Sequence, residues 1–295
     1  MINFGKVMTA MVTPFKADLS VDYKKAEELA IYLAQNGSDS IVVHGTTGES
    51  PTLTHEEEYE LYRTVKAALK GTSCVVIAGT GSNSTATTIN STKQAEKIGC
   101  DGAMIVVPYY NKPSAEGLYQ HFKAVADNTG LPLIIYNIPG RTGINMMPET
   151  LARVAQIKNY IGVKDAAGNL DQTSSTRAAC PKDFLIWSGD DSLTLPMLSV
   201  GAVGVISVAS HIVGKEISQM VNAYHSGDVK KAVELHLKLL PIFKVLFITS
   251  NPTPVKAALA MVKRPVGIPR LPLVEATDKE KDQIRAALKD LGLAK

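Results

Sequence analysis

The sequence predicts an α/β fold in which eight parallel strands close into a barrel, followed by a C-terminal all-helical appendage. Eight short runs rich in Val, Ile and Ala alternate with longer segments of helical period. The runs are almost continuously apolar, which is typical of parallel strands that are covered on both faces. After residue 226 the helical period continues, but no strand-like run recurs. Eight successive βα units favour a closed (β/α)8 TIM barrel.

Each predicted strand is short and is followed by a segment long enough for a helix. The predicted strands are Val7–Val12, Ser40–His44, Cys74–Ala78, Ala103–Val107, Leu133–Tyr136, Ile161–Lys164, Phe184–Ser188 and Val203–Val208. The helices between them are predicted near residues 22–36, 55–70, 85–98, 114–128, 148–157, 171–179, 191–199 and 214–226. We therefore expect a barrel domain over residues 1–226.

The appendage is predicted to contain three helices and to form a second domain over residues 227–295. These helices are expected near residues 228–247, 252–263 and 278–291. Candidate capping residues at helix starts along the whole chain are Asp22, Thr54, Ser114 and Thr277. Thr54 and Thr277 are each followed three residues later by a glutamate, which fits a capping box.

The alternative to a barrel is an open, doubly wound parallel sheet. Such a sheet is usually accompanied by a glycine-rich dinucleotide motif, and the nearest candidate begins Gly79-Thr80-Gly81. This stretch has no third glycine, and no acidic residue ends a following strand as the motif requires. A phosphate-binding motif of the G-x-x-x-x-G-K-[ST] type is also missing, so we favour the barrel.

Composition indicates an ordinary globular protein of a reducing compartment. Of 295 residues, 45% are hydrophobic and 20% charged, which excludes a disordered or fibrous chain. The three cysteines are scattered and form no C-x-x-C pair, which argues against a disulfide framework and a structural zinc site. The amino-terminal residues do not fit a signal peptide, so a cytoplasmic location is expected. The net charge of +3 is too small to indicate binding to nucleic acid.

One stretch, between Asp191 and Lys215, contains no charged residue and could be taken for a membrane span. Its 23 residues exceed the roughly 20 that a spanning helix needs. The stretch nevertheless contains Pro196, several serines and two glycines before Gly214, and these favour a short helix, a turn at Gly201 and a buried strand. We expect no membrane partner.

The most informative residue for chemistry is Lys164, which ends an apolar strand. In βα barrels the chemistry takes place where strands end and the following loops begin. Burial at that position disfavours the ammonium form, and a neutral amine can attack a ketone to form a Schiff base. The structural alternative is an ion pair with Asp165, or with Asp190 or Asp191 at the neighbouring strand end.

Further polar residues follow other predicted strands. The phenol of Tyr136 could relay a proton beside such an imine, or could simply bond to a loop carbonyl. Thr46 and Thr47 could hold a carboxylate, although both lie between glycines and could serve the turn alone. Arg141 follows a Pro-Gly turn and could bind a carboxylate with two hydrogen bonds, or could be a solvated surface charge.

Metal chemistry is not expected. The six histidines form neither an H-x-H nor an H-x-x-x-H pattern. A metal-dependent aldolase would need several histidine or acidic ligands at strand ends, where only His44, Glu49 and Asp165 with the Asp190-Asp191 pair occur. We expect His44 to be a core residue.

Five motifs at these strand ends occur together and in order. They are Gly45-Thr-Thr-Gly-Glu-Ser50, Tyr109-Tyr-Asn-Lys-Pro113, Tyr136-Asn-Ile-Pro-Gly-Arg141, Gly162-Val-Lys-Asp165 and Ser188-Gly-Asp-Asp191. With these motifs the chain resembles, over essentially its full length, the dihydrodipicolinate synthase family (4-hydroxy-tetrahydrodipicolinate synthases). This family belongs to the class I pyruvate aldolases, as does N-acetylneuraminate lyase.

The resemblance implies a lyase that condenses pyruvate with L-aspartate 4-semialdehyde in the lysine and diaminopimelate biosynthesis pathway, without a cofactor. It implies a pyruvate Schiff base on Lys164, with Tyr136 as proton donor and acceptor. The remaining implied roles are proton relay for Thr46 and for Tyr110 from a neighbouring subunit, and substrate binding for Thr47, Arg141, Gly189 and the Ile206 carbonyl. A homotetramer, arranged as a dimer of dimers, is implied as well.

The choice of reaction within the superfamily depends on few residues. Arg141 matches the residue that binds the carboxylate of aspartate semialdehyde in the synthases, and the neuraminate lyases resemble this chain less there and in the tyrosine pair. The alternatives are another pyruvate-dependent aldolase or a sugar-acid dehydratase. A barrel that binds 2-oxo acids without catalysis is a further alternative, against which the presence of Lys164, Tyr136 and Thr46 speaks.

Departures from the family pattern concern regulation by lysine. The members inhibited by lysine carry a histidine where this chain has Glu58, and a glutamate where it has Thr87. Pro51 also replaces a smaller residue, whereas Asn83 and Tyr109 match the pattern. We therefore predict that lysine inhibits this protein weakly or not at all.

Overall fold

The computed structural model describes residues 3–294 and contains a closed barrel of eight parallel strands. The strands are β1 (Val7–Ala10), β2 (Ser40–Val43), β3 (Val75–Gly79), β4 (Gly102–Val106), β5 (Leu133–Asn137), β6 (Tyr160–Asp165), β7 (Leu185–Ser188) and β8 (Gly204–Ser207). Each strand pairs with its sequence neighbours, and β1 also pairs with β8, which closes the barrel. The predicted barrel is therefore confirmed, and the open-sheet alternative is wrong.

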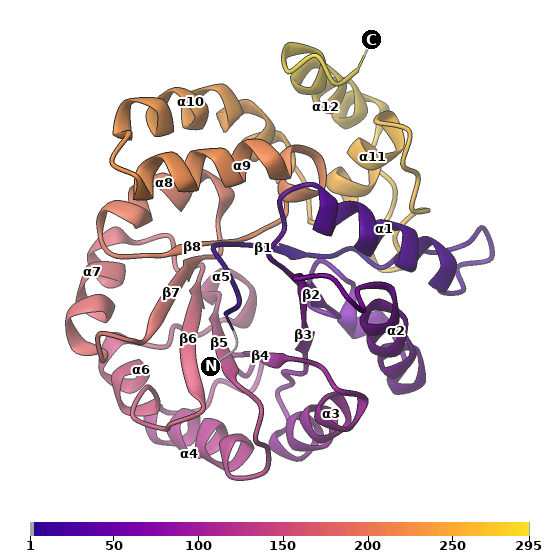
Figure 1. Ribbon diagram of the computed structural model, residues 1–295. Coiled ribbons are helices and arrows are strands. Elements are labelled where there is room, and N and C mark those ends of the chain that lie inside the picture. Colours follow the sequence, from indigo (N-terminus) through magenta and orange to yellow (C-terminus); the bar gives the residue numbers. More distant parts are fainter. Residues whose placement is uncertain (1–2, 295) are drawn as a thin grey trace.

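Helices form a ring around the barrel, as Figure 1 shows in a view along its axis. They are α1 (Tyr23–Gln35), α2 (His55–Ala68), α3 (Thr85–Ile98), α4 (Ala115–Ala126), α6 (Pro148–Val154), α7 (Leu170–Ala179), α8 (Thr194–Ser199) and α9 (Ser210–His225). Short helical turns at the strand ends are η1 (Ser50–Thr52), α5 (Pro139–Thr142) and η2 (Asp191–Leu193). The chain ends in α10 (Val229–Val245), α11 (Thr253–Met261) and α12 (Asp278–Asp290).

All eight predicted strands are confirmed to within two residues at each end, and the helices differ mainly in three places. The predicted 191–199 helix is divided into η2, whose first turn is capped by the Asp190 side chain, and α8. Helix α9 begins at Ser210 rather than near 214, with a non-helical residue at Val213. Helix α5 was not predicted, since four residues are too few to show a helical period.

The predicted capping residues are confirmed. The side chains of Asp22, Ser114, Thr54 and Thr277 each accept a hydrogen bond from a backbone N–H in the first helical turn. Helices α2 and α12 both have complete capping boxes. A side-chain cap of this kind contributes about 1 kcal/mol to stability and fixes where the helix starts. The α2 cap therefore also fixes where the preceding loop ends.

Two hydrophobic shells pack against the strands, one inside the barrel and one between the barrel and its helices. The inner shell contains Phe4, Met8, Ala10, Val42, Ile77, Met104, Ile134, Tyr136, Trp187 and Ile206. On β6 the inner position beneath Lys164 is Gly162, which lies opposite Ile134 in the register. A Cβ at Gly162 would lie 2.6 Å from the Trp187 ring, so the absence of a side chain makes room for the indole. Trp187 thus fills the barrel below Lys164.

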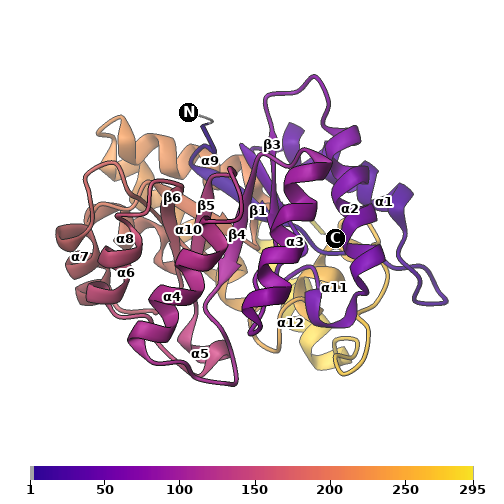
Figure 2. The same ribbon diagram turned by 90° about the horizontal axis from the view of Figure 1, so that it is seen from below.

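The C-terminal helices pack on one side of the barrel. Helix α10 packs against α9, and α11 packs against α9 and α12. Seen from the side in Figure 2, α11 and α12 lie toward the same end as α5, which follows β5. The appendage therefore lies near the carboxyl ends of the strands. The division of the chain into domains at residue 227 stays a prediction.

No helix within residues 3–294 is long and apolar enough to cross a membrane. The uncharged stretch after Asp191 instead contains α8, a turn and β8. Gly201 in that turn has a φ of 98°, a conformation that favours glycine, as expected for a turn at this position.

Candidate active site

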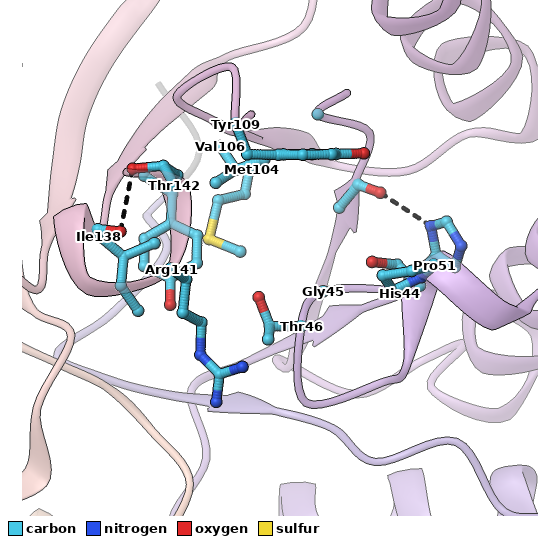
Figure 3. A pocket seen from close by; sticks show the side chains of 14 residues that line it. His44, Gly45, Thr46, Pro51, Met104, Val106, Tyr109, Ile138, Arg141 and Thr142 are labelled. Atoms are coloured by element: carbon cyan, nitrogen blue, oxygen red, sulfur yellow. Dashed lines mark hydrogen bonds between the residues drawn. The ribbon is translucent and has the colours of Figure 1, made fainter. Parts of the chain in front are cut away.

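A cavity of about 220 Å³ opens at the carboxyl ends of β2 to β5 (Figure 3). Its lining residues include His44, Thr46, Tyr109, Tyr136 and Arg141. In Figure 3 the Arg141 side chain extends toward Thr46, and the Tyr109 ring lies across the opposite side. The loops after several strands therefore bring together residues that lie almost a hundred positions apart in the sequence. A cavity of this size at this end of a barrel suits a small, charged substrate.

Lys164 lies at the carboxyl end of β6 and is 4% exposed. Its Nζ lies 4.2 Å from the centre of the Tyr136 ring, because the two residues are paired in register on adjacent strands. Burial lowers the pKa of Lys164 from 10.5 to about 8, although the charge of Asp191 opposes this shift. No ion pair among residues 3–294 includes Lys164, so the structural alternative of a salt bridge is wrong.

Tyr136 belongs to the inner shell of the barrel and borders the cavity. Burial raises the pKa of its phenol to about 12, and the Arg141 charge and a hydrogen bond with Thr46 oppose that rise. The phenol is therefore protonated at neutral pH and can donate its proton. The Lys164 amine and the Thr46 hydroxyl are both near it, as the predicted relay requires.

Thr46 and Thr47 lie in a compact turn after β2, which we call the threonine loop (residues 45–50). The N–H groups of Gly48 and Glu49 donate to the carbonyls of Gly45 and Thr46, at 3.0 Å in both cases. Thr46 borders the cavity, whereas Thr47 is 3% exposed. The hydroxyl of Thr47 accepts a hydrogen bond of 2.9 Å from the Asn251 side chain. The two threonines therefore belong to a hydrogen-bonded turn and also place their side chains at or beside the cavity.

Arg141 lies on α5 and links two hollows at the barrel end. It borders the cavity with Thr46 and Tyr136, and it also borders a second hollow with Ala166 and Gly189. Its Nη2 donates to the Asn251 carbonyl at 3.5 Å. A Cβ at Gly189 would lie 2.7 Å from that of Ala166, so glycine allows the close approach of these two loops. The structure thus brings Arg141 and Gly189 together.

Tyr109 and Tyr110 are adjacent in the sequence but lie in different surroundings. Tyr109 borders the cavity, whereas Tyr110 is 87% exposed and has a φ of 72°. The N–H of Tyr110 donates to the Thr142 carbonyl at 3.2 Å, which holds the loop after β4 against α5. The Tyr110 side chain therefore extends away from the cavity of its own chain.

Ile206 lies on β8 with a buried side chain in the inner shell, opposite Met8 of β1 in the register. The adjacent Ser207 donates to the Asp191 carboxylate at 2.5 Å. The same carboxylate accepts from the N–H groups of Val208 and Ala209 at 3.1 and 3.0 Å. Asp191 therefore fixes the end of the strand that contains Ile206.

His44 and Glu58 form a polar cluster beside the cavity. Glu58 is 2% exposed and accepts hydrogen bonds from Tyr62 at 2.8 Å and from His55 at 2.9 Å. His44 Nδ1 lies 3.0 Å from the Gly79 carbonyl, and burial lowers the pKa of this histidine. Among the described residues nothing bonds to its Nε2. His44 thus has one satisfied nitrogen, yet it borders the cavity rather than the core.

Two residues at the site were not predicted from the sequence. Asn251 contacts both Thr47 and Arg141, and Lys256 lies 2.6 Å from the Glu49 carboxylate. Both come from the C-terminal appendage, where no motif marks them. Within residues 3–294 no group of three or more His, Cys, Asp or Glu could hold a metal ion. Glu49, which was a conceivable ligand from its position, is paired with Lys256 instead.

Comparison with known proteins gives a consistent result. Residues 3–291 match the sequence profile of the dihydrodipicolinate synthetase family. A 4-hydroxy-tetrahydrodipicolinate synthase of Moorella thermoacetica is 57% identical, covering 99% of this chain and 100% of the relative. A crystal structure of the synthase from Cyanidioschyzon merolae, with lysine bound, superposes with a TM-score of 0.97 at 51% identity and covers 98% and 99% of the two chains.

The synthase of Acinetobacter baumannii, crystallised in complex with pyruvate, superposes with a TM-score of 0.95 at 39% identity. The match covers 99% of this chain and 100% of that one. Both the sequence profile and the relatives extend through the barrel and the C-terminal helices. This chain therefore belongs to the dihydrodipicolinate synthetase family.

Proposed function

We propose that this protein catalyses the reaction for which its relatives are named, the condensation of pyruvate with L-aspartate 4-semialdehyde to 4-hydroxy-tetrahydrodipicolinate. Full-length identity of 57% to a protein of that name supports the reaction. The observation that carries the mechanism is the buried Lys164 beside Tyr136 at the mouth of the barrel. Its pKa of about 8 leaves about a tenth of the amine neutral at pH 7.

In the first half of the reaction, the neutral Lys164 amine attacks the ketone carbon of pyruvate. The carbinolamine then loses water as Tyr136 protonates the departing hydroxyl, and Thr46 returns a proton to the phenolate. The hydroxyl of Thr47 and the backbone N–H groups of the threonine loop hold the pyruvate carboxylate. The carbonyl of Ile206 faces the bound keto acid. The resulting imine acidifies the methyl group of pyruvate, which loses a proton to give an enamine.

In the second half, the enamine carbon attacks the aldehyde of the semialdehyde and forms the new carbon–carbon bond. Arg141 holds the carboxylate of this second substrate, and the backbone of Gly189 lies beside it in the same hollow. The amine of the second substrate then attacks the imine carbon, which closes the ring and releases Lys164. Positioning of two charged substrates supplies much of the rate in such a step.

Tyr110 completes the proton relay in the active site of a neighbouring subunit. The exposure of its side chain in a single chain supports this role, because it faces away from its own cavity. A relay that needs a residue from another subunit requires an oligomer, and we propose a homotetramer built as a dimer of dimers.

Reduction with borohydride in the presence of pyruvate tests the mechanism directly. Borohydride converts an imine into a stable amine, so mass mapping identifies the modified residue. We expect the adduct on Lys164 and none in Lys164→Ala. An adduct on a different lysine would contradict the proposed mechanism.

A second measurement tests the choice of substrate. Turnover is assayed with pyruvate and aspartate semialdehyde, and separately for cleavage of sialic acid. We expect turnover only with the semialdehyde, and Arg141→Ala should raise the KM for the semialdehyde more than that for pyruvate. Cleavage of sialic acid would instead favour a lyase, and an imine without any turnover would favour a barrel that only binds 2-oxo acids.

A further inference from the structure

A buried ion pair joins the threonine loop to the C-terminal appendage. The Glu49 carboxylate lies 2.6 Å from Lys256 Nζ, and both side chains are only 2% exposed. Glu49 is part of the same loop as Thr46 and Thr47, whereas Lys256 lies on α11. A charge buried this deeply is costly unless it is paired, so each of these residues depends on the other.

Additional hydrogen bonds hold the two charges in place. The second oxygen of Glu49 accepts a hydrogen bond of 2.8 Å from the Arg270 N–H, and Lys256 donates to the Ile268 carbonyl at 3.3 Å. Lys256 Nζ also lies 4.2 Å from the centre of the Phe15 ring. Segments from the start, the barrel and the end of the chain therefore meet at this ion pair.

The backbone of Glu49 adopts a conformation that its own sequence does not favour. Its φ is 58° and its ψ is 36°, which is the left-handed region that residues with a Cβ seldom occupy. Such a conformation persists only where the surroundings enforce it. Because both oxygens of the Glu49 side chain are held by the appendage, we attribute the enforcement to Lys256 and the Arg270 backbone.

The same part of the appendage also contacts the residues that hold the substrates. The Asn251 side chain donates to the Thr47 hydroxyl at 2.9 Å, and its carbonyl accepts from Arg141. Lys256 itself does not border the cavity that contains Thr46 and Tyr136. An effect of Lys256 on substrate binding is therefore indirect, and the ion pair with Glu49 joins its side chain to the threonine loop.

We propose that Lys256 is a positioning residue, whose buried ion pair with Glu49 holds the threonine loop in the conformation that binds the keto-acid carboxylate. This inference rests on the proposed function, in which Thr46 and Thr47 bind pyruvate. The appendage then helps to hold the substrate-binding loop in place, in addition to packing against the barrel.

Three variants separate positioning from simple stability. Lys256→Met and Glu49→Gln each leave one buried charge without its partner. The double variant Glu49→Gln/Lys256→Met removes both charges with little change in side-chain shape. Lys281→Met is the matched control, since it breaks a partly exposed ion pair with Glu275 in the same appendage.

The kinetic readout is the KM for pyruvate compared with the KM for the semialdehyde. We expect each single variant to raise the pyruvate KM at least tenfold and the semialdehyde KM by less than threefold. The double variant should raise the pyruvate KM about fourfold, because no orphaned charge displaces the loop. The control should leave both constants unchanged. Folded variants with a pyruvate KM within twofold of the unmodified protein would overturn the proposal.

Hydrogen exchange provides a readout without substrate and covers the case in which the single variants do not fold. In the double variant, the amides of residues 45–50 should exchange at least tenfold faster than in the unmodified protein. A peptide from α4, on the far side of the barrel, serves as the internal reference. Unchanged exchange of the loop would overturn the positioning role whatever the kinetics show. Failure of pyruvate trapping on Lys164 in the unmodified protein would instead contradict the proposed function.

Discussion

Burial makes Lys164 and Tyr136 chemically complementary. The same desolvation lowers the pKa of the amine to about 8 and raises that of the phenol to about 12. At neutral pH the barrel mouth therefore contains an amine that is partly neutral and a phenol that is fully protonated. We therefore expect the amine to attack as a nucleophile and the phenol to donate a proton, which is the division of roles that imine formation needs.

Replacement of Tyr136 by phenylalanine should lower kcat by roughly 100-fold or more, the usual scale for loss of a general acid or base. The ring stays in the inner shell, so the fold should be retained. Tyr160→Phe is a matched control, because that buried tyrosine lies at the other end of the neighbouring strand and its hydroxyl donates to the Phe122 carbonyl. Steady-state kinetics give the kcat of both variants, and only Tyr136→Phe should show the loss. Turnover of a folded Tyr136→Phe protein near the normal value would remove Tyr136 from the mechanism.

Replacement of Lys164 by methionine should stabilise the protein while abolishing activity. Burial lowers the pKa of the ammonium from 10.5 to about 8, which corresponds to a cost of roughly 3 kcal/mol in the folded state, and methionine avoids this cost. The cost is fully present below pH 8 and disappears as the pH rises toward 10.5, since only the unfolded chain then still binds the proton. Urea unfolding at pH 7 and at pH 10 measures the unfolding free energy of the variant and of the unmodified protein at each pH.

The difference in unfolding free energy between Lys164→Met and the unmodified protein should therefore shrink at the higher pH. Lys93→Met, at an exposed position on α3, should change the stability little at either pH. A Lys164→Met protein that is less stable than the unmodified one at pH 7 would show that the ammonium is well solvated or paired.

The location of single residues was predicted correctly from the sequence where a motif and a strand end coincide. Lys164, Tyr136, Thr46 and Arg141 lie at one end of the barrel as expected, because parallel strands all end on the same side. The role of Lys256 could not be predicted in this way. An ion pair between residues on distant elements leaves no periodic or local pattern, and a lysine in a helix normally indicates only an exposed position.

At the scale of elements, we expect α2 and α3 to determine how the protein responds to lysine. The Glu58 carboxylate on α2 is already occupied by Tyr62 and His55, so it is not free to bind the ammonium of an effector. Thr87 on α3 provides no carboxylate either. An effector at this position would leave at least one charge without a partner, which is costly when the charge is buried.

We therefore expect lysine to reach half-inhibition only above about 1 mM, which corresponds to a binding free energy of about 4 kcal/mol. The measurement is a lysine titration of the initial rate at sub-saturating pyruvate. The variant Thr87→Glu, which supplies a carboxylate, should lower the half-inhibiting concentration. Half-inhibition of the unmodified protein well below 1 mM would show that Ser50, Asn83, Tyr109 and His55 suffice.

The extents of the elements were predicted well where length and period were clear. Every strand contains a short apolar run, and α2, α3 and α12 begin at side-chain caps. Helix α9 was predicted to start too late, because its first turn contains Ser210, His211 and Ile212, which show no clear helical period. Tertiary contacts, in which Ser210 bonds to Thr9 and His211 to the Val12 N–H, hold that turn.

At the scale of the whole molecule, we expect a homotetramer in which Tyr110 of each chain takes part in the proton relay of a neighbouring subunit. Analytical ultracentrifugation at assay concentration should show the tetramer. Tyr110→Phe should lower kcat while leaving the assembly intact, because loss of one hydroxyl from an exposed ring removes a proton donor and little contact area. A fully active monomer would contradict both the assembly and the role of Tyr110.

Arg270 lies 221 residues beyond Glu49 in the chain, and this distance determines the order in which the site is completed. A ribosome adds roughly 5–20 residues per second, so the threonine loop is made roughly 10–45 seconds before the residues that hold it. During that interval the nascent chain gains Tyr136 and then Lys164, while the partner of Glu49 does not yet exist. Under the proposed role of Lys256, a nascent chain therefore cannot capture pyruvate efficiently until Lys256 and Arg270 have been made.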